Sequence, residues 1–455
     1  MKRTLTSELA DWYAKAPHKP LVLRGARQVG KSHLVRAFAD AHAGAIVELN
    51  FERDRQAAKL FANSNDPVTI VRAIELFAKQ SVEPGKTLLF LDEIQAAPEI
   101  LAKLRWFAEE LPELHVVAAG SLLDFVLASH SFSMPVGRIR YLHLEPMSFK
   151  EFLWALGETM LAEHLAVIGL QAALPEPIHD RLLQLLREYM LVGGMPAAVE
   201  AYRRDRSLLS CARVHEDLLT TYRDDFAKYA PRVAQERLAK VMQAVPRQLG
   251  KKFKYVSVDR DERSVALRQA FDLLTKARVC HRVQATAATG IPLGAEANDR
   301  QFKAIFLDVG LVSAALGLSS DPTIDVESLV LANEGALAEQ VVGQMLRLLE
   351  PPFKEPELYY WAREERGSEA ELDYVIQHRA KVLPIEVKAG STGSLKSLHG
   401  FMSQRQLPIA VRFNASPPSI VDLDVRVKDG RQATYKLLSL PLYMVSDAPR
   451  IIDEL

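Results

Sequence analysis

Residues 21–39 read LVLRGARQVGKSHLVRAFA, and this stretch decides the fold of the N-terminal part of the chain. Within it, GARQVGKS at 25–32 matches the spacing G-x-x-x-x-G-K-[ST] without a mismatch. Apolar residues 21–23 precede the motif and a helical pattern over 32–39 follows it, which is the context that such a phosphate-binding loop requires. A chance glycine-rich turn is the alternative, and it would explain neither the spacing nor the context.

The chemistry of this loop follows from its backbone. Glycines let the chain curl so that N–H groups point at phosphate oxygens, and the N-terminus of the following helix adds a partial positive charge. We expect Lys31 to reach the β- and γ-phosphates of ATP and the Ser32 hydroxyl to bind Mg²⁺. The residues expected to hold the nucleotide in this loop are Gly25, Ala26, Arg27, Gln28, Val29, Gly30, Lys31 and Ser32.

A second motif lies downstream, where the apolar run of TLLFLDEIQ, residues 87–95, ends in Asp92 and Glu93. We expect Asp92 to hold Mg²⁺, directly or through water, and Glu93 to orient the attacking water. A buried strand that ends in a solvated acidic turn is the alternative. The number of residues between this motif and the phosphate-binding loop favours the catalytic interpretation.

Two further candidates follow the next apolar run, 115–119. Ser121 ends this predicted strand, where ATPases of this organisation carry a polar residue that senses the γ-phosphate. The string GRIRYLHLEPMSFKEFL, 137–153, then places Arg138 beside another apolar strand. Arg138 is either a finger or sensor arginine that stabilises charge on the transferred phosphate, or a surface arginine at a strand start. The sequence leaves both interpretations open.

Composition limits the class of protein. With 455 residues, the chain is expected to form two to four domains. The 57 basic residues balance 57 acidic residues, so any contact with nucleic acid must be local. Cys211 and Cys280 lie far apart without metal-ligand spacing, which argues against a zinc site or disulfide framework. No apolar run approaches the ~18–20 residues of a membrane span and no secretion segment is evident, so we expect a cytoplasmic protein without membrane contact.

Residues 1–155 alternate between strand and helix patterns, which predicts an α/β domain with a parallel sheet. The expected strands cover 21–23, 45–49, 87–91, 115–119 and 138–143, and the helices between them include 66–80 and 97–110. Phosphate sites lie at the carboxyl ends of such strands. We therefore predict a P-loop ATPase core over 1–155.

Helical periodicity dominates the middle of the chain. We expect a helical lid over 156–230 and a winged-helix-like region over 231–317. The segment 203–282 holds 19 lysines and arginines against 10 acidic residues. A helix predicted at 263–277 and a strand at 278–286 fit the end of a winged-helix unit, in which such a helix enters a DNA major groove. The alternative is a solvated helix that packs on the ATPase core.

Residues 318–455 carry a second set of polar groups. ELDYVI predicts a strand with Asp373 on one face. LPIEVK predicts the next strand, on which Glu386, thirteen residues after Asp373, and Lys388 lie on one face. Two such strands can hold a divalent metal and a water nucleophile beside a phosphodiester, with Lys388 positioning or deprotonating the water. Glu334, on a predicted helix upstream, is the candidate fourth member.

This order, Asp…Glu-x-Lys, is typical of nucleases with a restriction-endonuclease-like fold, and it predicts such an α/β domain over 318–455. The expected metal ligands are Asp373, Glu386 and Glu334, and the expected catalytic groups are Asp373, Glu386 and Lys388. The alternative is a salt-bridged Glu386–Lys388 pair in a fold that has lost catalysis.

The whole chain also resembles a known family. The strings GARQVGKS, LDEIQAAPEI, AAGSLLDF, GRIRYLHLEPMSFKEFL, VGGMPAAVEAY, IFLDVGL, ELDYVI and PIEVKAGS occur in this order. Together they resemble bacterial and archaeal AAA-type ATPases that carry an N-terminal ATPase, a winged-helix middle and a C-terminal domain of unknown function with a restriction-endonuclease-like fold. The resemblance implies the same nucleotide, sensor and nuclease-like residues. The middle departs from it, because KKFKYVSVDRDERSV is rich in charge and lacks a clean helix-turn-helix signal.

Two functions from different classes follow. The leading hypothesis is an ATPase that acts on DNA and carries a nuclease-like C-terminal domain. The rival is an ATP-dependent switch or scaffold whose C-terminal domain is structural and binds a protein partner. Balanced charge favours the rival, whereas the basic surplus and the Asp…Glu-x-Lys face favour the leader. A homo-oligomer is expected if Arg138 acts on the nucleotide of a neighbouring subunit.

Overall fold

The computed structural model describes residues 1–123, 133–170, 174–226, 232–318, 334–365, 368–390, 394–428 and 430–455. They form two compact units. Unit 1 comprises Met1–Pro146 with the short segments Lys276–Val279 and Pro351–Glu355, and unit 2 comprises Met147–Thr275, Cys280–Glu350 and Pro356–Leu455. No helix among the described residues is both long and apolar enough to cross a bilayer.

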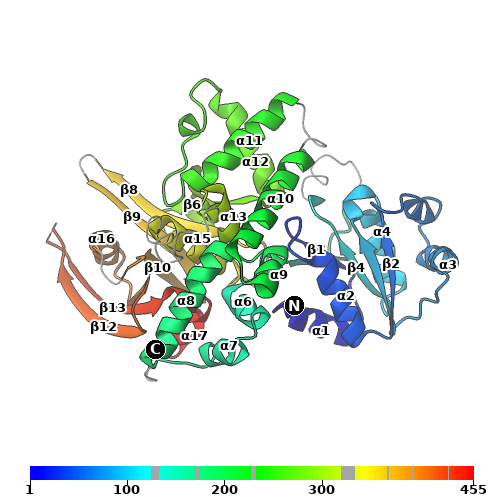
Figure 1. Ribbon diagram of the computed structural model, residues 1–455, viewed down its shortest axis with the longest axis horizontal. Coiled ribbons are helices and arrows are strands. Elements are labelled where there is room, and N and C mark those ends of the chain that lie inside the picture. Colours follow the sequence, from blue (N-terminus) through cyan, green and yellow to red (C-terminus); the bar gives the residue numbers. More distant parts are fainter. Residues whose placement is uncertain are drawn as a thin grey trace. The chain divides into compact units, whose positions relative to one another are not determined.

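Unit 1 is built on a five-stranded parallel sheet (Figure 1). Its strand order is β2-β3-β4-β1-β5. The strands are β1 (Leu21–Arg24), β2 (Ala45–Asn50), β3 (Thr87–Asp92), β4 (His115–Ala119) and β5 (Arg140–His143). β3 and β4 are buried along their whole length, as expected for central strands covered on both faces. The predicted parallel α/β fold is confirmed, and each predicted strand agrees with the structure to within two residues.

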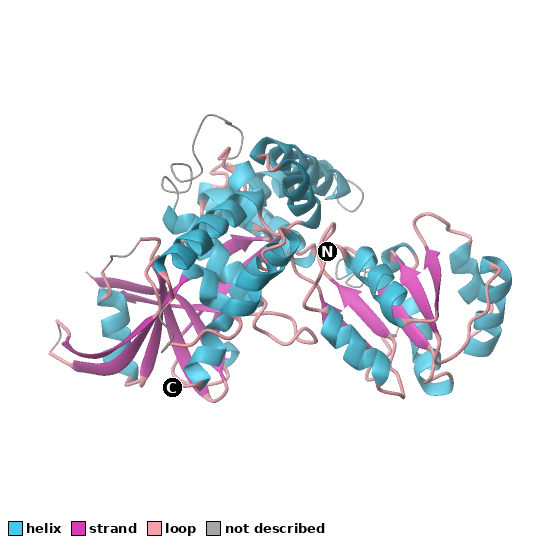
Figure 2. Cartoon of the chain, turned by 60° about the horizontal axis from the view of Figure 1, so that its bottom comes forward, coloured by secondary structure: helices cyan, strands magenta, loops and turns pink. Residues whose placement is uncertain are grey.

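Helices lie on both sides of this sheet (Figure 2). They are α1 (Thr6–Ala14), α2 (Lys31–His42), α3 (Pro67–Ala78) and α4 (Ile100–Glu110), with short 3-10 turns η1 (Ala57–Phe61) and η2 (Ile94–Ala96). Local sequence starts α3, because the Asp66 side chain accepts hydrogen bonds from the N–H groups of Val68 and Thr69 and Pro67 suits the first helical position. Apolar residues of α3 and α4 pack against β2, β3 and β4 to form the core of the unit.

Unit 2 begins with a series of helices. They are α6 (Phe149–Ala155), α7 (Thr159–Leu165), α8 (Glu176–Val192), α9 (Pro196–Asp205), α10 (Leu208–Phe226), α11 (Arg232–Arg247), α12 (Ser264–Lys276) and α13 (Val309–Ala315), with the 3-10 turns η3 (Tyr255–Ser257) and η4 (Leu293–Glu296). α6 starts at a capping box, in which the Ser148 hydroxyl accepts from the Glu151 N–H and the Glu151 carboxylate accepts from the Ser148 N–H. The predicted helix at 263–277 is confirmed as α12.

An eight-stranded mixed sheet follows, in the order β12-β13-β11-β10-β9-β8-β6-β7. Its strands are β6 (Cys280–Thr286), β7 (Ala297–Phe306), β8 (Leu358–Glu365), β9 (Ser368–His378), β10 (Lys381–Val387), β11 (Ile409–Asn414), β12 (Ser419–Arg426) and β13 (Gln432–Pro441). The helices of this part are α15 (Glu334–Arg347), α16 (Lys396–Arg405) and α17 (Ala448–Asp453), with the 3-10 turn η5 (Leu442–Asp447).

This sheet continues across residue 317, where the sequence placed a domain boundary. β6 and β7 fall in the expected winged-helix-like region, yet β6 pairs in parallel with β8 and antiparallel with β7. Pairing satisfies the backbone groups along the edge of β8, which would otherwise stay open. The winged-helix interpretation stays a prediction, whereas the two strands belong to the C-terminal sheet.

A buried aspartate links the middle of the chain to this sheet domain. The Asp308 carboxylate, fully buried before α13, accepts hydrogen bonds from the N–H groups of Gly194, Gly310 and Leu311 and from the Gln344 side chain. Gly193 has φ 73°, and a Cβ there would lie 2.0 Å from the Asp308 carboxylate. A Cβ at Gly194 would lie 2.1 Å from the Met147 carbonyl oxygen, and one at Gly310 would lie 2.4 Å from the Val192 carbonyl oxygen, so close approach requires glycine at all three positions.

Candidate functional site

The phosphate-binding loop spans 25–30, between the end of β1 and the start of α2. Gly30 adopts φ 96°, a left-handed conformation that favours glycine. A Cβ at Gly25 would lie 2.3 Å from the Leu144 carbonyl oxygen, so only glycine fits there. Both glycines of the motif are thus required by backbone geometry. The loop lies at the carboxyl end of the parallel strands, where the sequence placed it.

Lys31 is buried at the first turn of α2. Its Nζ donates hydrogen bonds to the carbonyl oxygens of Gly25, at 3.1 Å, and Ala26, at 2.8 Å. Burial lowers the pKa of Lys31 to about 8, against an opposing effect from the carboxylates of Glu93 and Asp92. The ammonium is therefore desolvated and contacts no carboxylate of the described residues, a state that an anionic phosphate would relieve.

Ser32 and Asp92 meet although they are sixty residues apart. The Ser32 Oγ donates to Asp92 Oδ1 at 2.8 Å, and the Asn50 side-chain amide donates to Asp92 Oδ2 at 3.0 Å. Burial raises the pKa of Asp92, and its hydrogen bond from Ser32 opposes that shift. A hydroxyl and a carboxylate oxygen that already touch fit the oxygen ligands that Mg²⁺ prefers. Ser32 and Asp92 would hold the ion, which supplies positive charge to the phosphates.

Glu93 directly follows β3 in a left-handed conformation, with φ 53°. Such a conformation is unusual for a residue with a side chain and is concentrated at functional sites. The Gln95 amide donates to Glu93 Oε2 at 2.6 Å and to Glu52 Oε1 at 3.2 Å, which fixes the glutamate. Gly120 allows this arrangement, because a Cβ there would lie 2.7 Å from Gln95 Oε1.

Ser121 lies at the end of β4, as predicted, and its hydroxyl is buried. Among the described residues its Oγ has no hydrogen-bond partner. A buried hydroxyl left without a partner costs about 1–3 kcal/mol, so a ligand oxygen at this position would be stabilised. The geometry is compatible with the predicted sensor role.

Arg138 lies elsewhere in unit 1. It precedes β5, whose first residue Arg140 donates its N–H to the Pro20 carbonyl, just before β1. Since β5 and β1 are parallel, Arg138 is at the amino end of the sheet, opposite the phosphate-binding loop of its own chain. Its side chain, 48% exposed, pairs with Glu109 of α4 at 2.6 Å. A role at the nucleotide of a neighbouring subunit stays a prediction.

Sequence reasoning missed two residues of this site. Asn50 ends β2 directly opposite Asp92 in the strand register and fixes its carboxylate. Gln95 fixes Glu93. A signal for Asn50 was present, because a polar residue after an apolar strand in a parallel sheet falls at the same edge as the phosphate-binding loop.

The C-terminal residues also come together, within unit 2. Asp373 on β9 and Glu386 on β10 lie on adjacent antiparallel strands, and Asp373 Oδ2 accepts the Val387 N–H at 2.7 Å. Lys388 Nζ lies 2.6 Å from Glu386 Oε1, so the two side chains share a face as expected. Glu386 Oε2 is buried and accepts no hydrogen bond among the described residues. The side chain of Glu334, at the start of α15, lies outside the described residues.

A lysine that the sequence did not single out lies among these carboxylates. Lys303, on β7, is 3% exposed. Its Nζ pairs with Glu339 of α15 at 3.3 Å, Glu371 of β9 at 2.5 Å and Asp373 at 3.6 Å. Burial lowers the pKa of Lys303, but the three carboxylates outweigh it and raise the pKa above its usual range. Lys303 therefore stays an ammonium ion at physiological pH. No local sequence signal identifies it, because β7 is distant in the chain.

Two of the carboxyl groups titrate near neutrality. Burial raises the pKa of Glu339 to about 7 and that of Glu386 to about 7. Among the described residues, no group of three or more His, Cys, Asp or Glu side chains is arranged to hold a metal ion. A divalent cation beside a buried ammonium would be repelled, so this cluster fits Lys303 better than a metal. The predicted metal site at Asp373 and Glu386 stays a prediction.

Comparison with known families divides the chain into three parts. Residues 17–153 match the model of an AAA domain. Residues 183–322 match a domain of unknown function (DUF8612), and residues 334–432 match another domain of unknown function (DUF4143). None of the curated proteins compared with the chain matches it. Residues 17–153 are thus similar to AAA domains in sequence, and the parallel sheet of unit 1 is consistent with a P-loop ATPase fold.

Similar solved structures include the Walker-type ATPase PABY2304 of Pyrococcus abyssi, with 15% identity, a TM-score of 0.42, and coverage of 68% of this chain and 94% of that one. The ORC2 protein of Aeropyrum pernix, in its ADPNP–ADP complexes, matches with 12% identity, a TM-score of 0.35, and coverage of 73% and 95%. PCH-2 of C. elegans matches with 13% identity, a TM-score of 0.26, and coverage of 43% and 59%.

Proposed function

We propose that this chain binds and hydrolyses ATP with Mg²⁺ and uses the cycle to act on DNA. One observation supports the ATPase activity most directly: two residues sixty positions apart meet beside the loop. The Ser32 hydroxyl contacts the Asp92 carboxylate at 2.8 Å, near a buried Lys31 that has no carboxylate partner among the described residues.

Each side chain then has a definite task. Lys31 exchanges the Gly25 and Ala26 carbonyls for phosphate oxygens, which are stronger partners for an ammonium ion. Ser32 and Asp92 hold Mg²⁺, which supplies positive charge to the phosphates. Glu93, fixed by Gln95, accepts a proton from the attacking water. Ser121 donates to the γ-phosphate.

The test compares wild-type protein with Lys31→Ala in ATP binding and turnover, with and without duplex DNA. We expect Lys31→Ala to abolish nucleotide binding or nearly so. Lys86→Ala is the control, because Lys86 is an exposed lysine of the same unit that pairs only with Glu83 among the described residues. Equal ATP affinity in Lys31→Ala and wild type would rule out the assigned site. Turnover unaffected by DNA would instead favour the switch or scaffold.

A second proposal concerns the C-terminal cluster: it is structural and does not cut nucleic acid. Lys303 supports it, because its ammonium pairs with Glu339, Glu371 and Asp373 and lies where a metal ion would have to bind. The test incubates single-stranded, duplex and branched DNA and RNA with Mg²⁺ or Mn²⁺ and ATP. We expect no cleavage. Cleavage that EDTA stops and Lys388→Ala abolishes, with ATPase activity retained, would instead establish the metal-dependent nuclease predicted from sequence.

A further inference from the structure

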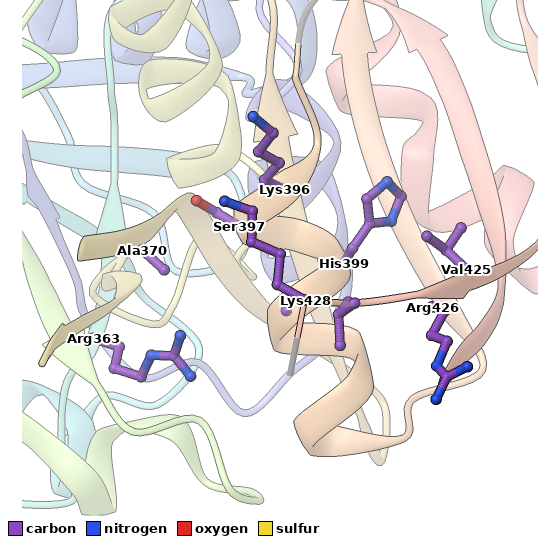
Figure 3. A pocket seen from close by; sticks show the side chains of 10 residues that line it. Arg363, Ala370, Lys396, Ser397, His399, Val425, Arg426 and Lys428 are labelled. Atoms are coloured by element: carbon purple, nitrogen blue, oxygen red, sulfur yellow. The ribbon is translucent and has the colours of Figure 1, made fainter. Parts of the chain in front are cut away.

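Two adjoining cavities lie on unit 2, and the larger one reaches Glu371 at the edge of the buried cluster. One has a volume of about 510 Å³ and the other about 950 Å³. Arg363, Ala370 and Ser397 line both, so the two cavities form one continuous depression. Figure 3 shows the smaller one, with Arg363 on one side, Arg426 on the other and Lys428 between them. We call the whole depression the basic groove.

The described lining of the basic groove is strongly cationic. Its lysines and arginines are Arg247, Lys251, Lys252, Lys254, Arg363, Lys396, Arg426 and Lys428. The carboxylate of Glu371 is the one acidic group among the residues that line it, and Glu371 pairs with Lys303. The groove therefore carries a large local positive charge on a chain whose formal net charge is zero.

Most of these cations are available to a ligand. Arg247, Lys251, Lys254, Lys396, Arg426 and Lys428 are all exposed. None of these six is ion-paired with a carboxylate of the described residues. Like charges gathered in a concave surface repel one another and focus a positive field, which attracts an anionic partner. Without an anionic partner, the repulsion among these cations only lowers the stability of the fold.

Folding creates this charge from segments far apart in the sequence. The basic residues come from the end of α11 and the turn after it, from strand β8, from the start of α16, and from the end of β12 with the turn that follows it. Eight lysines and arginines along one depression match a polymer with repeated phosphates better than a small anion. Among the described residues that line it, the aromatic side chains are Tyr360 and His399. Tyr360 is 1% exposed, so the surface is poorly suited to stacking unpaired bases.

We propose that the basic groove binds the phosphate backbone of a double-stranded nucleic acid. This inference rests on the proposed action on DNA, and it places the contact on the C-terminal sheet rather than on helix α12. Lysines and arginines bind phosphates without reading base sequence. Binding is therefore sequence-tolerant and falls steeply with salt. The groove also borders Glu371, so bound phosphates lie near the Lys303 cluster.

The experiment measures fluorescence anisotropy of labelled duplex DNA, duplex RNA and single-stranded DNA with the full chain at several salt concentrations. Two charge-reversal pairs change opposite parts of the groove: Lys251→Glu with Lys254→Glu, and Lys396→Glu with Lys428→Glu. Matched control pairs are Lys381→Glu with Lys436→Glu, exposed lysines of the same sheet that do not line the groove. Thermal melting verifies that each variant folds, and Lys→Gln pairs replace any that does not.

We expect each groove pair to weaken duplex binding by about tenfold or more and to lower the salt slope by about 0.9 per lost phosphate contact. The control pair should bind as wild type. If wild type binds duplex DNA and both groove variants bind it equally well, the groove is not the binding site. The proposed action on DNA would still stand. No binding by wild type even at low salt would overturn both. Tighter binding of single strands, or equal competition by poly-glutamate, would overturn the assignment to a duplex.

Discussion

Two buried lysines, one in each unit, show how the same desolvation leads to opposite states. Lys31 in the nucleotide site contacts only backbone carbonyls, and its pKa falls to about 8. Lys303 in the C-terminal cluster contacts three carboxylates, and its pKa rises above the usual range. Burial disfavours the ammonium in both cases, so the partners decide the outcome.

The difference separates a lysine with no ion-pair partner among the described residues from one that already has its anionic partners. Lys31 has no ion-pair partner in the described part of the chain, and phosphate oxygens would supply one. Lys303 has its anionic partners within the chain, so no ligand is needed. We therefore expect changes in the first site to alter activity and changes in the second to alter stability.

The largest effect is expected in the nucleotide site. Glu93→Gln keeps the shape of the side chain but removes the proton acceptor, so ATP turnover should fall by about 10²–10⁴-fold while ATP binding is retained. Melting temperature should change little, because the glutamine can still contact Gln95. Single-turnover hydrolysis and nucleotide titration measure the two quantities. Wild-type turnover in Glu93→Gln would remove the role assigned to this residue.

The C-terminal cluster should respond through stability. Lys303→Met leaves Glu339, Glu371 and Asp373 without their cation, which should lower the free energy of unfolding by about 3–5 kcal/mol. Adding Glu339→Gln should recover part of the loss by removing one unpaired charge. Urea unfolding of the single and the double variant measures both changes in the free energy of unfolding. Lys388→Met is the matched control and should cost less, because Lys388 is 26% exposed and pairs only with Glu386 among the described residues.

The response to metal ions tests the C-terminal cluster in a second way. Mn²⁺ should raise the melting temperature of Lys303→Met, because the freed carboxylates can then bind it, and should leave nucleotide-free wild type unchanged. Stabilisation of wild type by Mn²⁺ to the same extent would show that Lys303 does not exclude a metal, and the nuclease prediction would regain support.

A smaller effect is expected from pH on ATP affinity. The pKa of Lys31 is about 8 without ligand, and phosphate should raise it. Binding then takes up a proton above pH 8, so affinity should fall there by up to about tenfold per pH unit and stay flat below. Lys31→Arg, if it binds, should remove the dependence, since arginine stays charged. A flat profile for wild type up to pH 9.5 would contradict the lowered pKa.

The smallest effect is expected for Arg138→Ala in dilute protein, because Arg138 lies at the opposite end of the sheet and pairs with the exposed carboxylate of Glu109. Melting temperature and dilute ATPase rate should stay close to wild type. If Arg138 serves a neighbouring subunit, activity should fall at high concentration and partly return on mixing with Glu93→Gln protein. Normal turnover at every concentration would leave Arg138 a surface arginine.

The sequence determined the nucleotide-binding half of this protein, because its signals are local. The spacing of 25–32 fixed the loop, and apolar runs fixed the five strands to within two residues. Parallel strands bring their carboxyl ends to one edge, so Asp92 could be placed beside Ser32 from sequence alone. The sequence also predicted that Glu386 and Lys388 lie on the same face, because side chains two residues apart on a strand point to the same side.

Tertiary structure decided what had no local signal. Lys303 reaches the carboxylates of β9 and α15 only because β6 and β7 join the C-terminal sheet across residue 317. The basic groove likewise gathers positive charge from four separate segments, while the whole chain has no formal net charge. Pairing between distant strands depends on the packing of the complete sheet, which no short window of sequence contains.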